Sequence, residues 1–217
     1  MGKVNDTKER LLDAAHQLLW DESLAAASVD AICEKAGVKK GSFYHFFKSK
    51  EDLVAAALEA KFQSVKPELD RIFSSSVPPL DRLRKICDFL YQMQKQKLEQ
   101  AGRVVGCPYA SVGGSCSTED GTIQGKTRDI MATQIKYLET AIRDGQADGT
   151  IPGRDARAAA ESVFDFIEGA MTAARIRNDL KPVENLARGV FAMLGLPVDP
   201  VPPPVKVRVK ARARTRA

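Results

Sequence analysis

The side chains best suited to hold a phosphate group are concentrated between residues 34 and 50. This stretch contains five lysines against a single acid, Glu34, which gives a local charge of +4. Ammonium groups neutralise phosphates, and hydroxyl and aromatic side chains interspersed among the lysines add hydrogen bonds and contact area. Gly41 removes side-chain bulk where a backbone could approach a phosphate closely. The composition indicates contact with nucleic acid, although each lysine taken singly suits a solvated surface equally well.

Two short helices and the start of a third must position these residues. Ser28 is a good N-cap, an apolar stripe begins at Val29, and Gly37 can end the helix with a positive φ. A second helix follows at once, and Ser49 then caps a third. Lys50, just inside that third helix, can reach a phosphate beside the free N–H groups of the helix terminus. Two helices across a tight glycine turn predict a helix-turn-helix, which places its second helix in the DNA major groove.

The residues V-K-K-G-S-F-Y-H-F-F-K-S-K-E-D-L resemble the recognition helix and following helix of the tetracycline-repressor (TetR/AcrR) family. The stretch T-K-E-R-L-L-D-A-A-H-Q-L-L-W resembles the first helix of that family, with Thr7 as its cap, so the resemblance covers residues 7–58. It implies a double-stranded DNA interface made by the groove-lining residues and the helix starts. The expected DNA-contacting residues are Thr7, Ser28, Lys39, Lys40, Gly41, Ser42, Tyr44, His45, Lys48 and Lys50. Packing or plain exposure is the alternative for Tyr44 and His45.

The rest of the chain keeps a helical period of apolar residues and shows no alternating strand pattern. The fold is therefore expected to be all-α, with a three-helix helix-turn-helix domain at residues 1–52 and a helical ligand-binding and dimerisation domain at residues 53–196. A Pro-rich linker and basic tail occupy residues 197–217. Helices are expected up to about Ser64 with a break near Pro67, and then at 79–100, 108–112, 123–145, 156–176 and 182–194.

The helices at 156–176 and 182–194 are apolar on more than one side, which indicates burial on several sides. That burial occurs at a subunit interface or in an ordinary intrachain core. The resemblance favours the interface, because the family forms two-fold homodimers by packing these helices in a four-helix bundle. Two-fold symmetry suits a palindromic operator with half-sites roughly 34 Å apart or a multiple of that distance.

The resemblance also implies that the middle helices enclose a small-molecule effector, whose identity the residues do not reveal. The candidate lining residues are Phe89, Met93, Cys107, Tyr109, Tyr137, Phe166 and Met171. Each of them alone suits a simple core position.

Cys107, preceded by Gly106 and followed nine residues later by Cys116, is similar to the electrophile- and oxidant-sensing repressors of the family. A helix start and the nearby Arg103 would lower the pKa of the Cys107 thiol and make it reactive. The alternative is a small apolar residue in a loop.

The net charge of +5 includes six basic residues between Lys206 and Arg216, and without them the body carries −1. This tail is expected either to bind DNA phosphates without sequence preference or to be a solvated end without function. The polar N-terminus and the lack of a long apolar run predict a cytoplasmic, nucleoid-associated protein without a membrane segment.

Catalytic chemistry is not expected. The four cysteines form no C-x-x-C pair, so neither a metal site nor a cofactor is predicted, and no Ser/His/Asp set or paired carboxylates can be assembled. We therefore expect a ligand-responsive homodimeric repressor. The alternatives are a repressor that senses electrophiles or oxidants through Cys107 and an effector-independent, architectural DNA-binding protein.

Overall fold

The computed structural model describes residues 2–21, 24–116, 121–153 and 155–198. All regular elements in these ranges are helices, so the all-α prediction is confirmed. In order they are α1 (Gly2–Asp21), α2 (Val29–Ala36), α3 (Lys40–Phe46), α4 (Lys50–Ile72), α5 (Pro79–Ala101), α6 (Pro108–Ser115), α7 (Gly121–Ala147), α8 (Ala156–Arg177), α9 (Lys181–Glu184) and α10 (Leu186–Met193). The Pro-rich linker beyond Val198 and the basic tail lie outside the described residues.

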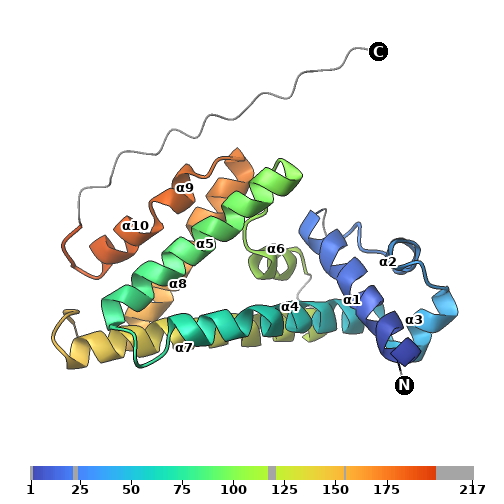
Figure 1. Cartoon of the computed structure of the whole chain (residues 1–217), viewed down its shortest axis with the longest axis horizontal. Helices are drawn as coiled ribbons and strands as arrows, with labels where there is room; N and C mark the ends of the chain where they lie inside the picture. Colours follow the sequence, from blue (N-terminus) through green and yellow to red (C-terminus); the bar gives the residue numbers. More distant parts are fainter. Residues whose placement is uncertain (1, 22–23, 117–120, 154, 199–217) are drawn as a thin grey trace, which may run out of the picture.

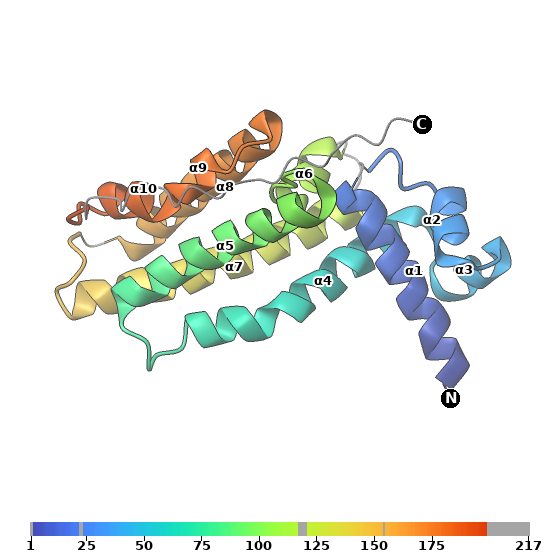
Figure 2. The same ribbon diagram turned by 45° about the horizontal axis from the view of Figure 1, so that its top comes forward.

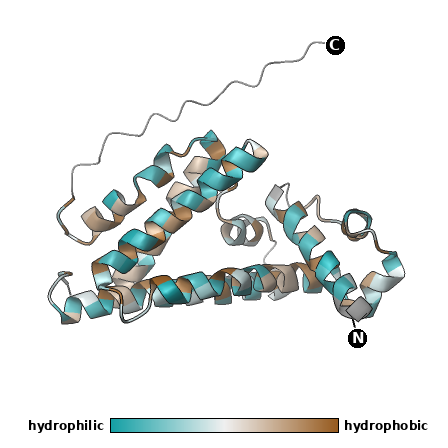
Figure 3. Ribbon diagram, viewed as in Figure 1, coloured by the Kyte–Doolittle hydropathy of each residue, from teal (hydrophilic) through white to brown (hydrophobic). Residues whose placement is uncertain are grey.

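The helices form two groups joined by α4. Helices α1–α3 stand together at the N-terminal end, and α5 and α8–α10 lie at the other end (Figure 1). Helix α7 runs beside α4 and packs on α8, while α6 sits between α5 and α1 (Figure 2). One continuous core runs from Leu11 and Phe43 in the first group to Ile142 and Leu186 in the second. Apolar and polar residues alternate around the helices, as amphipathic helices require (Figure 3).

Side-chain caps fix the starts of three helices. The Ser28 and Ser49 hydroxyls accept hydrogen bonds from the backbone N–H groups of Ala31 (3.1 Å) and Asp52 (3.2 Å), as the sequence predicted. Asp155 caps α8 in the same way. Each cap satisfies one of the N–H groups that a helix start leaves without an intrahelical partner. The positions of α2 and α4, which hold α3 between them, are therefore encoded locally.

The prediction that Thr7 caps the first helix is wrong, because α1 begins at Gly2 and Thr7 lies inside it. Residues 3–6 contain no helix breaker, and Asp6 pairs with Arg10 one turn later, at 3.9 Å. Such i,i+4 pairs on a helix surface support additional turns.

The prediction of a break near Pro67 is also wrong, since α4 continues to Ile72 with Pro67 inside it. Proline removes the hydrogen bond to the carbonyl four residues earlier, at Gln63. Gln63 and Pro67 are both exposed, so water can satisfy that carbonyl, and the buried Leu69 and Ile72 hold the last turns against the core. The proposed boundary at residue 52 accordingly falls within one continuous helix.

Smaller differences concern two other helix ends. Helix α7 continues past Gly145 to Ala147, and the single helix expected from Pro182 is two helices, α9 and α10, which meet at Asn185.

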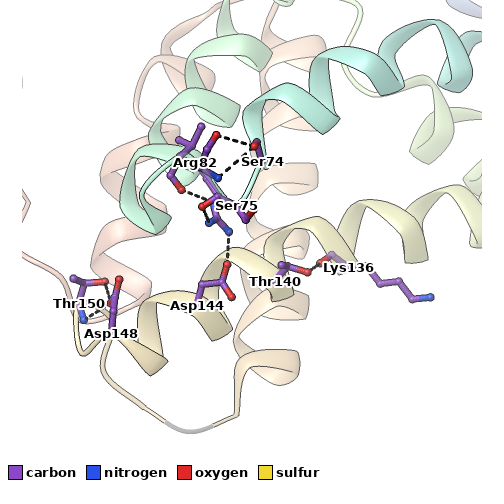
Figure 4. Close-up of polar contacts among 10 residues, drawn as sticks. Ser74, Ser75, Arg82, Lys136, Thr140, Asp144, Asp148 and Thr150 are labelled. Atoms are coloured by element: carbon purple, nitrogen blue, oxygen red, sulfur yellow. Dashed lines mark hydrogen bonds and ion pairs between the residues drawn. The ribbon is translucent and has the colours of Figure 1, made fainter.

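A buried arginine, Arg82 of α5, holds the loop between α4 and α5 against α7. The Arg82 guanidinium, 2 % exposed, donates to Val77 O at 2.7 Å and to Ser75 O at 3.3 Å. Nη1 of the same guanidinium group forms an ion pair with Oδ2 of Asp144 in α7 at 2.5 Å (Figure 4). Arg82 thus ties the loop and the start of α5 to α7.

Candidate nucleic-acid interface and ligand cavity

The turn between α2 and α3 has the geometry of a helix-turn-helix. Gly37 adopts φ 62°, and the Val38 N–H bonds back to the Cys33 carbonyl at 3.0 Å. Arg10 of α1 donates to the carbonyls of Ala36 and Gly37, so the first helix holds the turn from outside. A Cβ atom at Gly37 would lie 2.8 Å from the Arg10 guanidinium. The positive φ favours glycine here, whereas the Arg10 side chain could shift to make room.

Helix α3 buries one side and exposes the other. The Phe43 side chain is fully buried, Phe47 is buried just beyond the helix, and Phe46 is half-buried. Tyr44 is 58 % exposed although it is a large aromatic residue, and its ring packs edge to face on Phe43. The exposed residues that the sequence assigned to DNA on and beside α3 are Lys39, Lys40, Gly41, Tyr44, His45 and Lys48, and Ser42 is half-buried. The structure therefore brings these predicted residues onto one end of the molecule.

The surface at Gly41 is open. A Cβ atom built on this residue would have no atom within 4 Å of it, so packing within the chain does not require glycine. The missing side chain leaves room for a molecule outside the chain to approach the backbone at this point.

Two of the predicted DNA-binding lysines have partners within the chain. Lys40 forms an ion pair with Asp30 at 2.8 Å, and this partner raises the pKa of Lys40. Lys50 donates to the Leu24 carbonyl at 2.9 Å. Neither Lys39 nor Lys48 has an ion-pair partner among the residues that the structure describes. Thr7, inside α1, offers no helix terminus to a phosphate, which corrects the role expected for it.

A mostly apolar cavity of about 90 Å³ lies among α1, α4, α5, α7, α8 and the start of α6. Six of the seven predicted lining residues are in its wall, namely Phe89, Met93, Cys107, Tyr109, Tyr137 and Met171. The seventh, Phe166, is a correction, because it lies on the other side of α8 against Gly189 of α10. An i, i+3, i+4 pattern cannot tell which side of a helix that is apolar all round will face a cavity.

Sequence reasoning missed several residues of the wall. They are Trp20, Lys61, Phe62, Val65, Leu69, Phe73, Ile86, Leu90, Gly106, Pro108, Gln134, Leu138, Phe164, Ile167 and Glu168. Glu168 carried a usable signal, since it is an acid within the apolar run of α8. Trp20 carried none, because it belongs to the first helix and reaches the cavity only through the tertiary packing of α1 on α4 and α6.

Aromatic contacts connect the cavity to α1, the helix that holds the turn between α2 and α3. Trp20 of α1 meets Tyr109 of α6 edge to face, with ring centroids 6.3 Å apart, and Phe62 of α4 contacts the same tyrosine at 6.4 Å. The Lys61 ammonium lies 5.9 Å from the centroid of the Trp20 ring. Burial, and then repulsion by Lys97, lower the pKa of Lys61. A molecule in the cavity would therefore touch a residue of the first helix directly.

The segment before α6 is held by a buried amide. Gln94, fully buried in α5, accepts hydrogen bonds from the N–H groups of Val105 (3.2 Å) and Gly106 (2.9 Å) and donates to the Gly106 carbonyl (3.1 Å). Satisfied buried networks of this kind rigidify a backbone. They fix the position of Cys107 at the start of α6.

The surroundings of Cys107 favour an ordinary buried residue over a reactive thiol of low pKa. The residue is 8 % exposed, and burial, followed by the nearby Glu168, raises the pKa of its thiol well above the usual value. Desolvation outweighs the helix start here, because the thiolate is the charged form that burial penalises. All four cysteines are free thiols, and Cys87, whose pKa burial raises to about 12, is a core residue, as is Cys33.

Two family models match the chain. The model described as bacterial regulatory proteins, tetR family, covers residues 11–57, and that of the tetracyclin repressor-like C-terminal domain covers residues 79–190. The chain belongs to the tetR family. It is a DNA-binding transcriptional regulator and not an enzyme. No helix in the described part of this tetR-family chain is long and apolar enough to cross a membrane.

Relatives of this tetR-family chain extend over most of its length. The transcriptional regulator AcuR of Cereibacter sphaeroides is 27 % identical over 83 % of this chain and 81 % of its own. The transcriptional repressor NemR of Escherichia coli K12 is 25 % identical over 89 % of this chain and 96 % of its own. A crystal structure of a regulatory protein TetR from Rhodobacter sphaeroides superposes with a TM-score of 0.72 at 26 % identity, covering 85 % of this chain and 97 % of that one.

Proposed function

We propose that this regulator acts as a homodimeric repressor that binds a palindromic operator through two copies of α3 and releases it when a small molecule fills the cavity. We base the coupling on Trp20, which belongs to the DNA-binding helices and also lines the cavity. A ligand shifts an equilibrium only by its differential affinity for the two states. Contact with Trp20 gives such a difference a physical origin.

The DNA-contacting surface in this proposal consists of Lys39, Gly41, Tyr44, His45 and Lys48, supported by the helix start at Ser28. Ser42, Lys40 and Lys50 also contribute to this surface. To contact a phosphate, Lys40 exchanges or shares its ion pair with Asp30, and Lys50 does the same with its hydrogen bond to the Leu24 carbonyl. One such surface is small, and the body of the chain has little net charge. Specific binding at nucleoid DNA therefore needs two copies held at a fixed spacing.

The dimer interface is proposed on the outer side of α8 and α10. Ile176 is 79 % exposed and Met193 is 47 % exposed, both unusual for large apolar side chains. Phe166 and the small residues Gly169 and Ala173 border a shallow surface on the same side of α8. Gly189 lets α10 lie tightly on α8, since a Cβ atom there would sit 2.1 Å from the Phe166 ring. A second copy packed here would form a four-helix bundle.

Sedimentation and selection of bound sequences from random DNA test this proposal together. The wild-type chain should sediment as a dimer and select a two-fold symmetric sequence. Ile176→Glu places a charge at the proposed interface without disturbing the core of the monomer, so it should give monomers and lose most of the selected affinity. Thr140→Glu, at an outward position of α7, is the matched control. A dimeric Ile176→Glu protein, or selection of an asymmetric site, would contradict the proposal.

A further inference from the structure

The cavity wall contains two buried hydrogen-bond acceptors that other described residues leave unsatisfied. They are Oε2 of Glu168 on α8 and Oε1 of Gln134 on α7. The Glu168 carboxyl group lies beside the Cys107 thiol, and its Oε2 has no hydrogen-bond partner among the described residues. Both residues belong to the wall of the same cavity, so a ligand that fills it contacts both side chains.

Unsatisfied buried acceptors are rare because each one costs the free energy of its lost hydration. Burial raises the pKa of Glu168 and so favours its protonated form, whose carbonyl oxygen still accepts hydrogen bonds, as the Gln134 amide oxygen does. A molecule that offers an N–H or O–H group would give these oxygens the hydrogen bond that they lost when burial removed them from water. An acceptor-only molecule would leave the Glu168 and Gln134 oxygens unsatisfied.

The rest of the wall favours an apolar, compact body. Aromatic rings from six helices surround the space, among them Trp20, Phe62, Tyr109 and Phe164. The Tyr137 hydroxyl is already directed to Asp70, and the Lys61 ammonium lies over the Trp20 ring. The volume of about 90 Å³ is of the same order as the ~150 Å³ engineered apolar cavity that takes up benzene. A single ring or a short chain therefore matches the cavity.

We propose that the effector is a small, largely apolar molecule with one hydrogen-bond-donating N–H or O–H group, which Glu168 and Gln134 recognise. This inference rests on the proposed function, since it names the ligand class of the same cavity. Glu168 and Gln134 determine specificity in it, and the aromatic wall supplies most of the contact area.

The test uses three probes of similar size on the full chain: phenol as the donor, fluorobenzene as a near-isostere without a donor, and benzoate as an acceptor-only anion. Dissociation constants are measured by ligand-observed NMR. Phenol should bind roughly tenfold or more tightly than either of the others, because a site built to hydrogen-bond a donor rejects an analogue without it. Equal affinities, tightest binding of benzoate, or no saturable binding of phenol would each overturn the inference.

Two variants test whether Glu168 and Gln134 cause the preference for phenol over fluorobenzene. Glu168→Leu should reduce the phenol-to-fluorobenzene ratio to about one, and Gln134→Leu should reduce it in part. Glu161→Leu, on the exposed side of α8, should leave the ratio unchanged. Thermal melting checks that each variant is folded. The affinity ratio of the wild-type chain tests the inference even if a variant does not fold. An unchanged ratio in folded Glu168→Leu would contradict recognition by this residue.

Failure of this inference and failure of the proposed function are separable. Selective phenol binding that leaves the DNA complex intact would uphold the recognition chemistry and contradict the release mechanism. Release of DNA by another compound, with no preference for hydrogen-bond donors, would uphold the release mechanism and contradict the recognition chemistry.

Discussion

Trp20 of α1 and Tyr109 of α6 meet edge to face, with ring centroids 6.3 Å apart. One ring belongs to the helices that carry the helix-turn-helix and the other to the short helix at the cavity, and both line the cavity. Aromatic pairs of this geometry contribute roughly 0.5–1.5 kcal/mol beyond their buried area. A ligand that displaces the Trp20 ring therefore acts on α1 directly, and one that displaces the Tyr109 ring acts on α1 through its contact with Trp20.

Removal of the Tyr109 ring should uncouple ligand from DNA. We expect Tyr109→Leu to bind operator DNA about as tightly as wild type but to need roughly tenfold more ligand for half-release, since coupling energies are typically about 1–3 kcal/mol. Tyr109→Phe keeps the ring and should behave like wild type. Fluorescence anisotropy of labelled DNA measures both quantities. Normal release by Tyr109→Leu would show that the signal takes another route.

Gly41→Ala should weaken DNA binding and leave folding intact. The added Cβ meets no atom of the chain, and alanine is about 1 kcal/mol more favourable than glycine within a helix, so the melting temperature should hold or rise. DNA affinity should fall about tenfold or more if the backbone approaches a phosphate there. Gly125→Ala in α7, which is equally open, is the control. Unchanged DNA affinity in Gly41→Ala would remove Gly41 from the interface.

Lys39 and Lys48 should contribute phosphate contacts. Each neutralised phosphate adds about 0.9 to the slope of log affinity against log salt concentration. Lys39→Ala or Lys48→Ala should therefore lower the slope by about one contact per binding chain and weaken all sequences alike. Lys136→Ala, on the exposed surface of α7, should leave the slope unchanged. An identical slope in Lys48→Ala would mean that this lysine stays solvated.

Arg82 should be a major stabilising residue. Arg82→Leu removes the hydrogen bonds to Val77 O and Ser75 O and leaves Asp144 without its partner. We expect a loss of about 2–4 kcal/mol in the free energy of unfolding, measured by urea denaturation. Arg143→Leu breaks a surface pair with Glu139 and should cost less than about 1 kcal/mol. Equal losses in the two variants would contradict a buried clamp.

Cys107 should react slowly with alkylating reagents at neutral pH. Because burial raises the pKa of its thiol, the reactive thiolate is scarce at pH 7 and the alkylation rate should still be rising above pH 9. Half-exposed Cys116 should react first with iodoacetamide, as peptide mass spectrometry can show. Cys107→Ser should accordingly keep its response to a non-covalent effector. A rate at Cys107 that is already maximal near pH 7 would restore the electrophile-sensing alternative.

Local signals predicted the helix-turn-helix well because its turn and caps are encoded within a few residues, as at Ser28, Gly37 and Ser49. The same local rules failed at Pro67, where exposure of the proline side of α4 and burial of Leu69 and Ile72 decided the outcome. The cavity depended on packing between distant elements. Phe89 and Met93 could be named in advance because the family resemblance placed a cavity among the middle helices. Trp20 became visible only once α1 was packed on α4 and α6.

The central claim is that α3, with its open surface at Gly41, reads a two-fold symmetric DNA site. A DNase footprint of the wild-type chain on the DNA flanking its own gene, repeated with Gly41→Ala and Gly125→Ala, tests it most directly. We predict one discrete, symmetric protected site with wild type and Gly125→Ala, and its loss with Gly41→Ala at the same concentration. Diffuse protection without a symmetric site, or an identical footprint for all three proteins, would contradict the claim.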